Sequence, residues 1–287
     1  MQYHTATSFE NAVELAQAAK GTTRFLAGGT DVLVQLRGDF VTPDVLIDIK
    51  QIPGAAGIQW LADGSWQIGA AVSGAQLYEH EALKTEWPGL VEAMNLIGST
   101  QVQGRATLSG NLCNGSPAAD SVPAMLAADV SVTIIDPDGQ RQVPVVAIPR
   151  GPGQTTLKQG EVISSVNIPA QSATGADAYL RFIPRTEMDI AVVGCAVNLS
   201  LDGPEITAAK VAIGAVAPTA RAVDSAANAI VGTTLDDAAL TALADAVREA
   251  CDPIDDKRGT IEYRTHVAGV LAQRAAKIAY QRARSKS

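Results

Sequence analysis

The stretch Phe25-Leu26-Ala27-Gly28-Gly29-Thr30-Asp31 defines the fold of the N-terminal part of the chain. It joins a short apolar strand, expected over residues 23–27, to a short helix expected from Val32 to near Gly38. Two consecutive glycines at such a junction let the main chain approach a ligand closely, and the N–H groups that follow face an anion, ideally a phosphate. The alternative is a tight turn that needs glycine for a positive φ. The Rossmann G-x-G-x-x-G motif is absent from the sequence.

The elements on either side of this stretch alternate between helix and strand. Ser8 is a plausible N-cap, with Asn11 three positions later, for a helix over residues 8–20. The turn sequences Asp63-Gly64 and Pro137-Asp138-Gly139 each predict a β-hairpin. Further elements up to residue 168 are expected as strands over 45–49 and 161–168, helices over 77–83 and 90–97, and a loop over 150–156.

A second segment, residues 104–120, is rich in Gly, Ser, Thr and Asn and is expected to be a long loop. Its hydroxyls, amides and exposed backbone donors suit a polyhydroxylated, phosphorylated ligand. Ser116 followed by Pro117 predicts a helix start with proline at the first helical position. Asp120 then falls in the first turn, where the helix dipole favours a carboxylate with or without a ligand.

The C-terminal third reads as strands followed by helices, an α+β pattern. The small, polar residues 171–175 mark the best domain boundary. Strands over 190–201 and 206–216 are expected to form a long hairpin, and helices are expected over 236–250 and 263–284. Arg181 and Arg185 precede the first of these strands, where they could face an anion or an electron-rich ring, or simply pair with surface carboxylates.

The composition excludes several classes of protein. Lys and Arg number 22 against 30 Asp and Glu, so the net charge of −8 lacks the basic surface of a nucleic-acid-binding protein. With 47% hydrophobic residues the chain can build a sizeable core, and no 18-residue apolar run predicts a membrane span. Three isolated cysteines, Cys113, Cys195 and Cys251, form no disulfide framework, which is typical of a cytoplasmic protein.

No metal site or catalytic group stands out. The three cysteines cannot supply the four thiolates of an iron–sulfur cluster. His4, His80 and His266 lack metal-ligand spacing. The sequence also has no G-x-S-x-G, H-E-x-x-H or Walker A motif, and its first residues lack the features of a secretory signal.

The segments described above, in this order and at these separations, resemble the FAD-binding medium subunit of molybdenum hydroxylases, the family of xanthine and carbon monoxide dehydrogenases. The resemblance covers nearly the whole chain. It rests on Ala27-Gly28-Gly29-Thr30-Asp31, Thr107-Leu108-Ser109-Gly110-Asn111, Gly214-Ala215-Val216-Ala217-Pro218-Thr219-Ala220-Arg221-Ala222, Tyr263-Arg264 and Val270-Leu271. Ser109 replaces the first glycine of the family's second motif, and Thr30-Asp31 favours the xanthine-dehydrogenase-like branch.

The resemblance implies an α+β fold. A two-part FAD-binding domain of the PCMH/VAO type would span residues 1–174, with subdomains of about 1–55 and 56–174, and an α+β domain similar to the C-terminal domain of the CO dehydrogenase flavoprotein would span 175–287. It also assigns FAD as the cofactor. The cofactor-binding residues that it implies are Leu26, Ala27, Gly28, Gly29, Thr30 and Asp31 with Thr107, Gly110 and Asn111 at the diphosphate, Asp120 at the ribityl or nearby flavin groups, and Ile97, Ile163 and Arg181 near the flavin ring.

The function implied is electron transfer within a heteromeric complex. Electrons would pass from a large molybdopterin-binding subunit through a small [2Fe–2S] subunit to FAD on this chain, and then to NAD or a quinone. The cofactor carries the redox chemistry, which agrees with the lack of a catalytic nucleophile or acid–base pair. Two alternatives stay open: a stand-alone flavin oxidase, and a non-catalytic scaffold subunit that has lost FAD.

Overall fold

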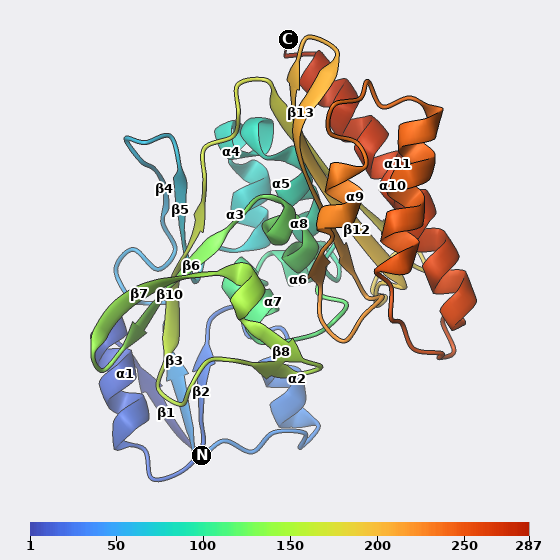
Figure 1. Cartoon of the computed structure of the whole chain (residues 1–287). Coiled ribbons are helices and arrows are strands. Elements are labelled where there is room, and N and C mark those ends of the chain that lie inside the picture. Colours follow the sequence, from blue (N-terminus) through green and yellow to red (C-terminus); the bar gives the residue numbers. More distant parts are fainter. Residues whose placement is uncertain (287) are drawn as a thin grey trace.

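The computed structural model describes residues 1–286 and builds its N-terminal part around a small parallel sheet (Figure 1). The strand order is β1-β3-β2, and β3 is buried along its length. Its elements are β1 (Gln2–Thr5), α1 (Phe9–Ala18), β2 (Thr23–Leu26), α2 (Val32–Arg37) and β3 (Val45–Asp48). The expected cap is confirmed, because the Ser8 hydroxyl accepts a hydrogen bond from the Asn11 N–H at 3.0 Å.

The middle part combines an antiparallel sheet, of order β4-β5-β10-β6-β7, with six short helices and one 3₁₀ turn. Both predicted hairpins are present, as β4–β5 and β6–β7. The strands are β4 (Ile58–Trp60), β5 (Trp66–Gly69), β6 (Ser131–Asp136), β7 (Gly139–Pro144) and β10 (Val162–Ile168). The helices are α3 (Gly74–Glu79), α4 (Glu81–Glu86), α5 (Pro88–Asn95), α6 (Thr100–Gln103), α7 (Leu108–Cys113), α8 (Ser121–Ala127) and the 3₁₀ turn η1 (Val145–Ala147).

Three predictions for this part are wrong in detail. The helix expected over 77–83 is two helices, because His80 has an extended backbone and its Nδ1 accepts from the Leu83 N–H as the N-cap of α4. The loop expected over 150–156 is a small hairpin that turns at Gly153 (φ +69°), formed by β8 (Pro149–Gly151) and β9 (Gln154–Thr155). The long loop expected over 104–120 contains helix α7.

The helix start expected at Pro117 is also wrong. The Ser116 hydroxyl accepts from the Ala118 N–H at 3.2 Å, which holds this proline in a turn. Helix α8 begins only at Ser121, and Asp120 occupies its N-cap position without capping it. The Asp120 side chain is therefore available for contacts outside its own helix.

The C-terminal part is a four-stranded sheet of order β11-β12-β13-β14 with helices on both faces (Figure 1). The expected long hairpin is present as β12–β13. The sequence pattern did not reveal β11, since the buried polar side chains of Asp177 and Arg181 interrupt its apolar run. The elements are β11 (Gly175–Phe182), β12 (Val193–Asp202), β13 (Glu205–Gly214), β14 (Arg221–Ala222), α9 (Asp224–Asn228), α10 (Asp237–Glu249) and α11 (Ile261–Arg284).

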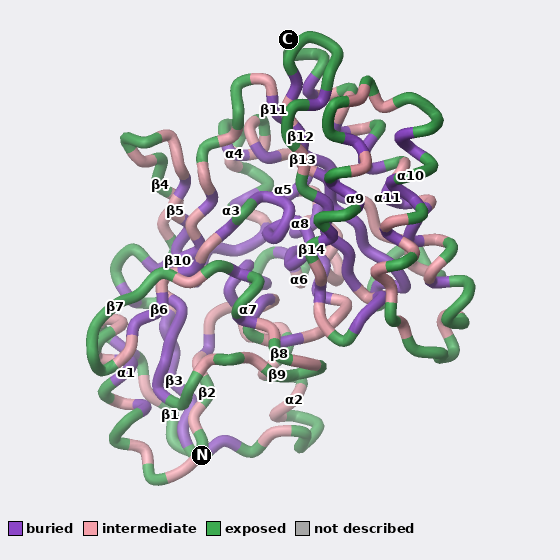
Figure 2. The backbone as a smooth tube through the Cα atoms, in the orientation of Figure 1, coloured by how far each residue is buried: buried purple, intermediate pink, exposed green. Residues whose placement is uncertain are grey.

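Most of β11 and β12 and the second half of β13 are buried in the C-terminal sheet (Figure 2). Helices α11 and α9 lie on one face, with α10 packed against both of them, and α5 and α8 of the middle part lie on the other face. Tyr179, Ala196 and Ala212 are register partners on adjacent strands and belong to the hydrophobic core of the middle part. Asp177 adds a polar connection, because its carboxylate accepts the N–H groups of Gly89 and Leu90 at 2.9 Å each, at the start of α5.

Candidate functional site

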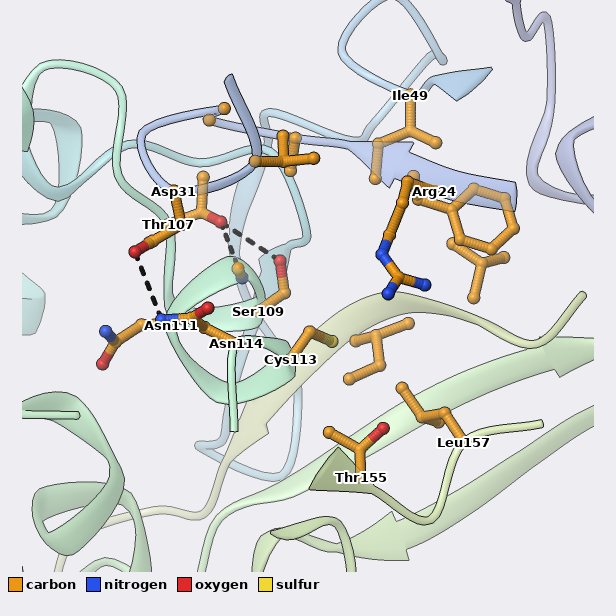
Figure 3. A pocket seen from close by; sticks show the side chains of 18 of the residues that line it. Arg24, Asp31, Ile49, Thr107, Ser109, Asn111, Cys113, Asn114, Thr155 and Leu157 are labelled. Atoms are coloured by element: carbon orange, nitrogen blue, oxygen red, sulfur yellow. Dashed lines mark hydrogen bonds between the residues drawn. The ribbon is translucent and has the colours of Figure 1, made fainter. Parts of the chain in front are cut away.

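A cavity of about 740 Å³ lies between the end of β2, the loop before α2, helix α7 and the β8–β9 hairpin (Figure 3). Its size falls within the range of about 300–1,000 Å³ that is usual for small-molecule sites. Its wall draws on both segments that the sequence singled out. The expected site residues that line it are Ala27, Gly28, Gly29, Thr30, Asp31, Ile97, Thr107, Gly110, Asn111 and Ile163.

The two glycines serve different purposes. A Cβ at Gly28 would lie 1.9 Å from the carbonyl oxygen of Arg105, so only glycine lets the first loop rest on the backbone that leads into α7. Gly29 has φ +81°, a conformation that side-chain-bearing residues rarely adopt. The positive φ expected of a tight turn therefore holds at Gly29, while Gly28 brings the two loops together.

The first loop presents free backbone donors at the cavity wall. Within residues 1–286, none of the five consecutive N–H groups from Gly28 to Val32 has a hydrogen-bond partner in the protein. A buried or half-buried N–H group without a partner is costly, so such groups are normally bonded by protein, water or ligand. A run of them on a cavity wall is the arrangement that binds a phosphate.

The second segment forms the facing wall through α7. The Thr107 hydroxyl caps this helix by accepting the Gly110 N–H at 2.9 Å. Ser109, which replaces the family glycine, is buried and donates to the carbonyl of Ala70 at 2.6 Å. Its side chain thus fastens α7 to the rest of the middle part. Asn111 uses its Oδ1 to accept from the Ser121 hydroxyl at 2.7 Å.

Three of the expected site residues lie outside the cavity wall. Leu26 is buried beneath the first loop, where its Cδ1 would be 2.8 Å from a Cβ at Gly29. Asp120 and Arg181 form a buried ion pair at 2.9 Å, and Asp120 also accepts from the Tyr179 hydroxyl at 2.9 Å. Burial raises the pKa of Asp120 to about 6, against the lowering effect of Arg181 and Tyr179.

The cavity also contains cations that sequence reasoning missed. Arg24 projects from β2 toward the wall formed by Cys113 and Leu157 (Figure 3), and its guanidinium donates a hydrogen bond to the carbonyl of the adjacent Thr23 at 3.3 Å. Lys158 lines the same end, and neither cation has a carboxylate partner among residues 1–286. The nearby Glu161 is paired with Arg141 at 2.9 Å. The sequence does contain one sign of this role for Arg24, which is that a cation stands inside the apolar strand expected over residues 23–27.

Comparison with known families accounts for most of the chain. Residues 1–171 match the FAD-binding domain in molybdopterin dehydrogenase, and residues 178–279 match the C-terminal domain of the CO dehydrogenase flavoprotein. The chain belongs to the FAD-binding family of the molybdopterin dehydrogenases. The family and the α+β fold class expected from the sequence are confirmed, and FAD is the cofactor of this family.

Individual relatives match over almost their whole length. The xanthine dehydrogenase FAD-binding subunit of Escherichia coli O157:H7 is 31% identical over 95% of this chain and 93% of its own. The carbon monoxide dehydrogenase medium chain of Hydrogenophaga pseudoflava is 32% identical over 98% and 97%. Identity at this level does not separate the two branches of the family that the Thr30-Asp31 pair was expected to distinguish.

Solved structures show the same fold. Carbon monoxide dehydrogenase from Hydrogenophaga pseudoflava, in a form that lacks the Mo-pyranopterin moiety, superimposes with a TM-score of 0.94 at 32% identity over 98% of both chains. Quinoline 2-oxidoreductase from Pseudomonas putida 86 gives a TM-score of 0.92 at 25% identity, over 99% of this chain and 98% of its own. The fold of these two structures thus extends over nearly the whole chain.

The contact of Gly28 with Arg105 gives a direct test of the cavity. Gly28→Ala should force the two loops apart, at a cost of about 1–3 kcal/mol in the free energy of unfolding. FAD affinity should fall by roughly tenfold or more, since about 1.4 kcal/mol of lost binding is already tenfold. Isothermal titration and chemical denaturation measure the two effects.

Gly151→Ala is the matched control, because a Cβ at Gly151 meets no atom within 4 Å and its φ is not in the left-handed region. It should bind FAD as the unchanged protein does. Unaltered FAD affinity in Gly28→Ala would show that the two loops do not form the cofactor site.

Proposed function

We propose that this chain is the electron-transferring flavoprotein subunit of a heteromeric molybdenum hydroxylase. In this proposal it receives electrons from the iron–sulfur clusters of a partner and passes them to NAD, a quinone or another acceptor. The observation that carries the proposal is the cavity between the two loops, where a run of unpartnered N–H groups faces a wall formed by α7. A cavity of about 740 Å³ has room for a nucleotide cofactor.

The residues present fit FAD. The N–H groups from Gly28 to Val32 would bind the diphosphate, whose negative charge also suits the unpaired Arg24 and Lys158. Thr107, Gly110 and Asn111 would complete the phosphate site from the side of α7. In this assignment Leu26 supports the loop from below.

The flavin end of the cavity is assigned to its apolar wall. Ile97 is half-buried and Ile163 is buried, and both line the cavity, so they would pack against the ring. Asp120 and Arg181, which the family resemblance put near the flavin, are paired with each other outside the cavity wall, so we assign them to support of the site and not to direct contact with FAD. When bound, FAD supplies the capacity to accept and release electrons, and the protein positions it and adjusts its potential.

The need for partners follows from the chemistry that this chain lacks. Three separate cysteines cannot ligate an iron–sulfur cluster, which requires four ligands. Within residues 1–286, no group of three or more His, Cys, Asp or Glu side chains could hold a metal ion. We therefore assign the molybdopterin cofactor to a large partner subunit and the [2Fe–2S] clusters to a small one.

Among residues 1–286, no helix is both long and apolar enough to cross a membrane.

The flavin should be bound without a covalent link. Residues 27–31 include neither histidine nor cysteine, and the thiol nearest to the second loop is that of Cys113, which lies on the cavity wall. Denaturation with acid or heat, followed by filtration, should release all of the flavin into the filtrate. Cys113→Ser should carry the same amount of flavin as the unchanged chain. Flavin that stays with the precipitated protein would contradict this assignment.

The isolated chain should bind FAD yet fail to oxidise a hydroxylase substrate such as a purine or an aldehyde. Activity should appear only when the molybdenum and iron–sulfur subunits are co-expressed with it, because these subunits supply the substrate site and the path for electrons. Substrate-dependent dye reduction by the isolated chain and by the complex is the measurement. Turnover by a demonstrably partner-free chain would favour a stand-alone flavin oxidase, and a chain that binds no FAD would favour a scaffold.

A further inference from the structure

A buried polar cluster joins the C-terminal sheet to the middle part of the chain. Asp120, at the start of α8, accepts from the Tyr179 hydroxyl on one carboxylate oxygen and from the Arg181 guanidinium on the other, both at 2.9 Å. Tyr179 is 3% exposed and Asp120 is 7% exposed. Tyr179 and Arg181 are two residues apart on β11, so both side chains lie on the face of the sheet that packs on α8.

Ser121 connects this polar cluster to the cavity wall by hydrogen bonds to Asn111. Ser121 directly follows Asp120, and its hydroxyl and N–H donate to Oδ1 of Asn111 at 2.7 and 3.3 Å. Asn111 lines the cavity from α7. A continuous series of hydrogen bonds and one peptide link thus runs from Tyr179 on the C-terminal sheet to a side chain of the cofactor cavity.

The backbone around Tyr179 and Asp120 leaves room for the hydrogen bond between them. A Cβ at Gly194, on the adjacent strand β12, would lie 2.5 Å from the Tyr179 hydroxyl and would displace it. The Ala215 N–H, after β13, donates to the carbonyl of Pro117 at 2.7 Å, so the turn before Asp120 is also fastened to the C-terminal part. The segment between α7 and α8 is therefore held from the C-terminal sheet at two points.

We propose that Tyr179 is a positioning residue for the FAD site, which acts through Asp120 and Ser121 on Asn111 and so links occupation of the cavity to docking of the C-terminal sheet. The proposal rests on the cavity being the FAD site. Because coupling between two sites is reciprocal, FAD should in turn protect β11 from opening. Within residues 1–286, the side-chain hydrogen bond of Tyr179 goes to Asp120 and not to a residue of the cavity wall.

The pKa of the Asp120 carboxylate gives a second way to test the role of Tyr179, through the pH dependence of FAD affinity. Burial raises its pKa to about 6, and donation by Tyr179 works against that rise by favouring the ionised form. The charged and titratable groups that face it are Arg181 and Tyr179 of β11, and Cys195 of β12 lies near Tyr179. Protonation of Asp120 removes its ion pair with Arg181, so FAD affinity should fall as the pH drops through about 6.

Tyr179→Phe removes the hydroxyl and preserves the ring that fills the core. Loss of one buried hydrogen bond to a charged group should weaken FAD binding by roughly tenfold at pH 7. The pH midpoint of FAD affinity should move upward, because Asp120 loses a donor that favours its ionised form. Tyr280→Phe is the matched control: it removes a hydroxyl bonded to the Pro204 carbonyl at 2.6 Å, on the same C-terminal part but away from the cavity. The control should leave both quantities unchanged.

Gly194→Ala tests the same contact without deleting it. The added Cβ should push the hydroxyl off Asp120 and weaken FAD binding to a similar extent. In the double variant Tyr179→Phe/Gly194→Ala the 2.5 Å contact with the hydroxyl is gone, and the nearest ring carbons lie at 3.3 and 3.4 Å from the added Cβ. The FAD affinity should therefore be close to that of Tyr179→Phe alone. Hydrogen exchange should show that FAD protects residues 175–182 in the unchanged protein and protects them less in Tyr179→Phe.

The outcomes separate the two proposals. If the unchanged protein does not bind FAD, the assignment of the cavity is wrong. If it binds FAD but Tyr179→Phe matches Tyr280→Phe in affinity and in pH midpoint, Tyr179 is not a positioning residue and the FAD site stands. Additive effects of Tyr179→Phe and Gly194→Ala would also overturn the proposed coupling, because they would show that the two positions act independently.

Discussion

The backbone contact between Gly28 and the Arg105 carbonyl is the constraint on which the site depends. It seats the loop of a small parallel sheet on the segment that leads into α7, and a single Cβ at position 28 would lie 1.9 Å from that oxygen. The cavity exists because these two segments, far apart in sequence, meet here while the N–H groups from Gly28 to Val32 remain free. Ser109 reinforces the arrangement by bonding α7 to the Ala70 carbonyl.

Much of this could be predicted from the sequence, because the deciding signals are local. The Ser8 cap, the two hairpin turns and the Gly28-Gly29 pair each report a backbone conformation that few other residues provide. The long hairpin and the last two helices follow from their apolar periodicity. The resemblance to a known family added the cofactor and joined two loops whose proximity no local signal could have shown.

The features that the sequence did not predict depend on contacts between residues that are distant in sequence or on a side chain that caps a helix. Strand β11 was missed because Asp177 is buried as a cap for α5, and Arg181 is buried against Asp120. The same pairing placed Asp120 and Arg181 off the cavity wall, although the sequence gives no sign that they meet. The helix predicted over residues 77–83 is two helices, because the His80 ring accepts the Leu83 N–H and so caps α4. Identifying β11 as a strand would have put Tyr179 and Arg181 on one face.

Competition binding on flavin-free protein tests the central claim that the two loops hold the diphosphate of FAD, in a cavity that Arg24 and Lys158 also line. The account predicts that one FAD binds per chain, that ADP displaces it, and that FMN, which lacks the adenylate half, binds at least roughly tenfold more weakly, a difference of about 1.4 kcal/mol. Equal affinity for FMN and FAD, together with no displacement by ADP, would contradict it.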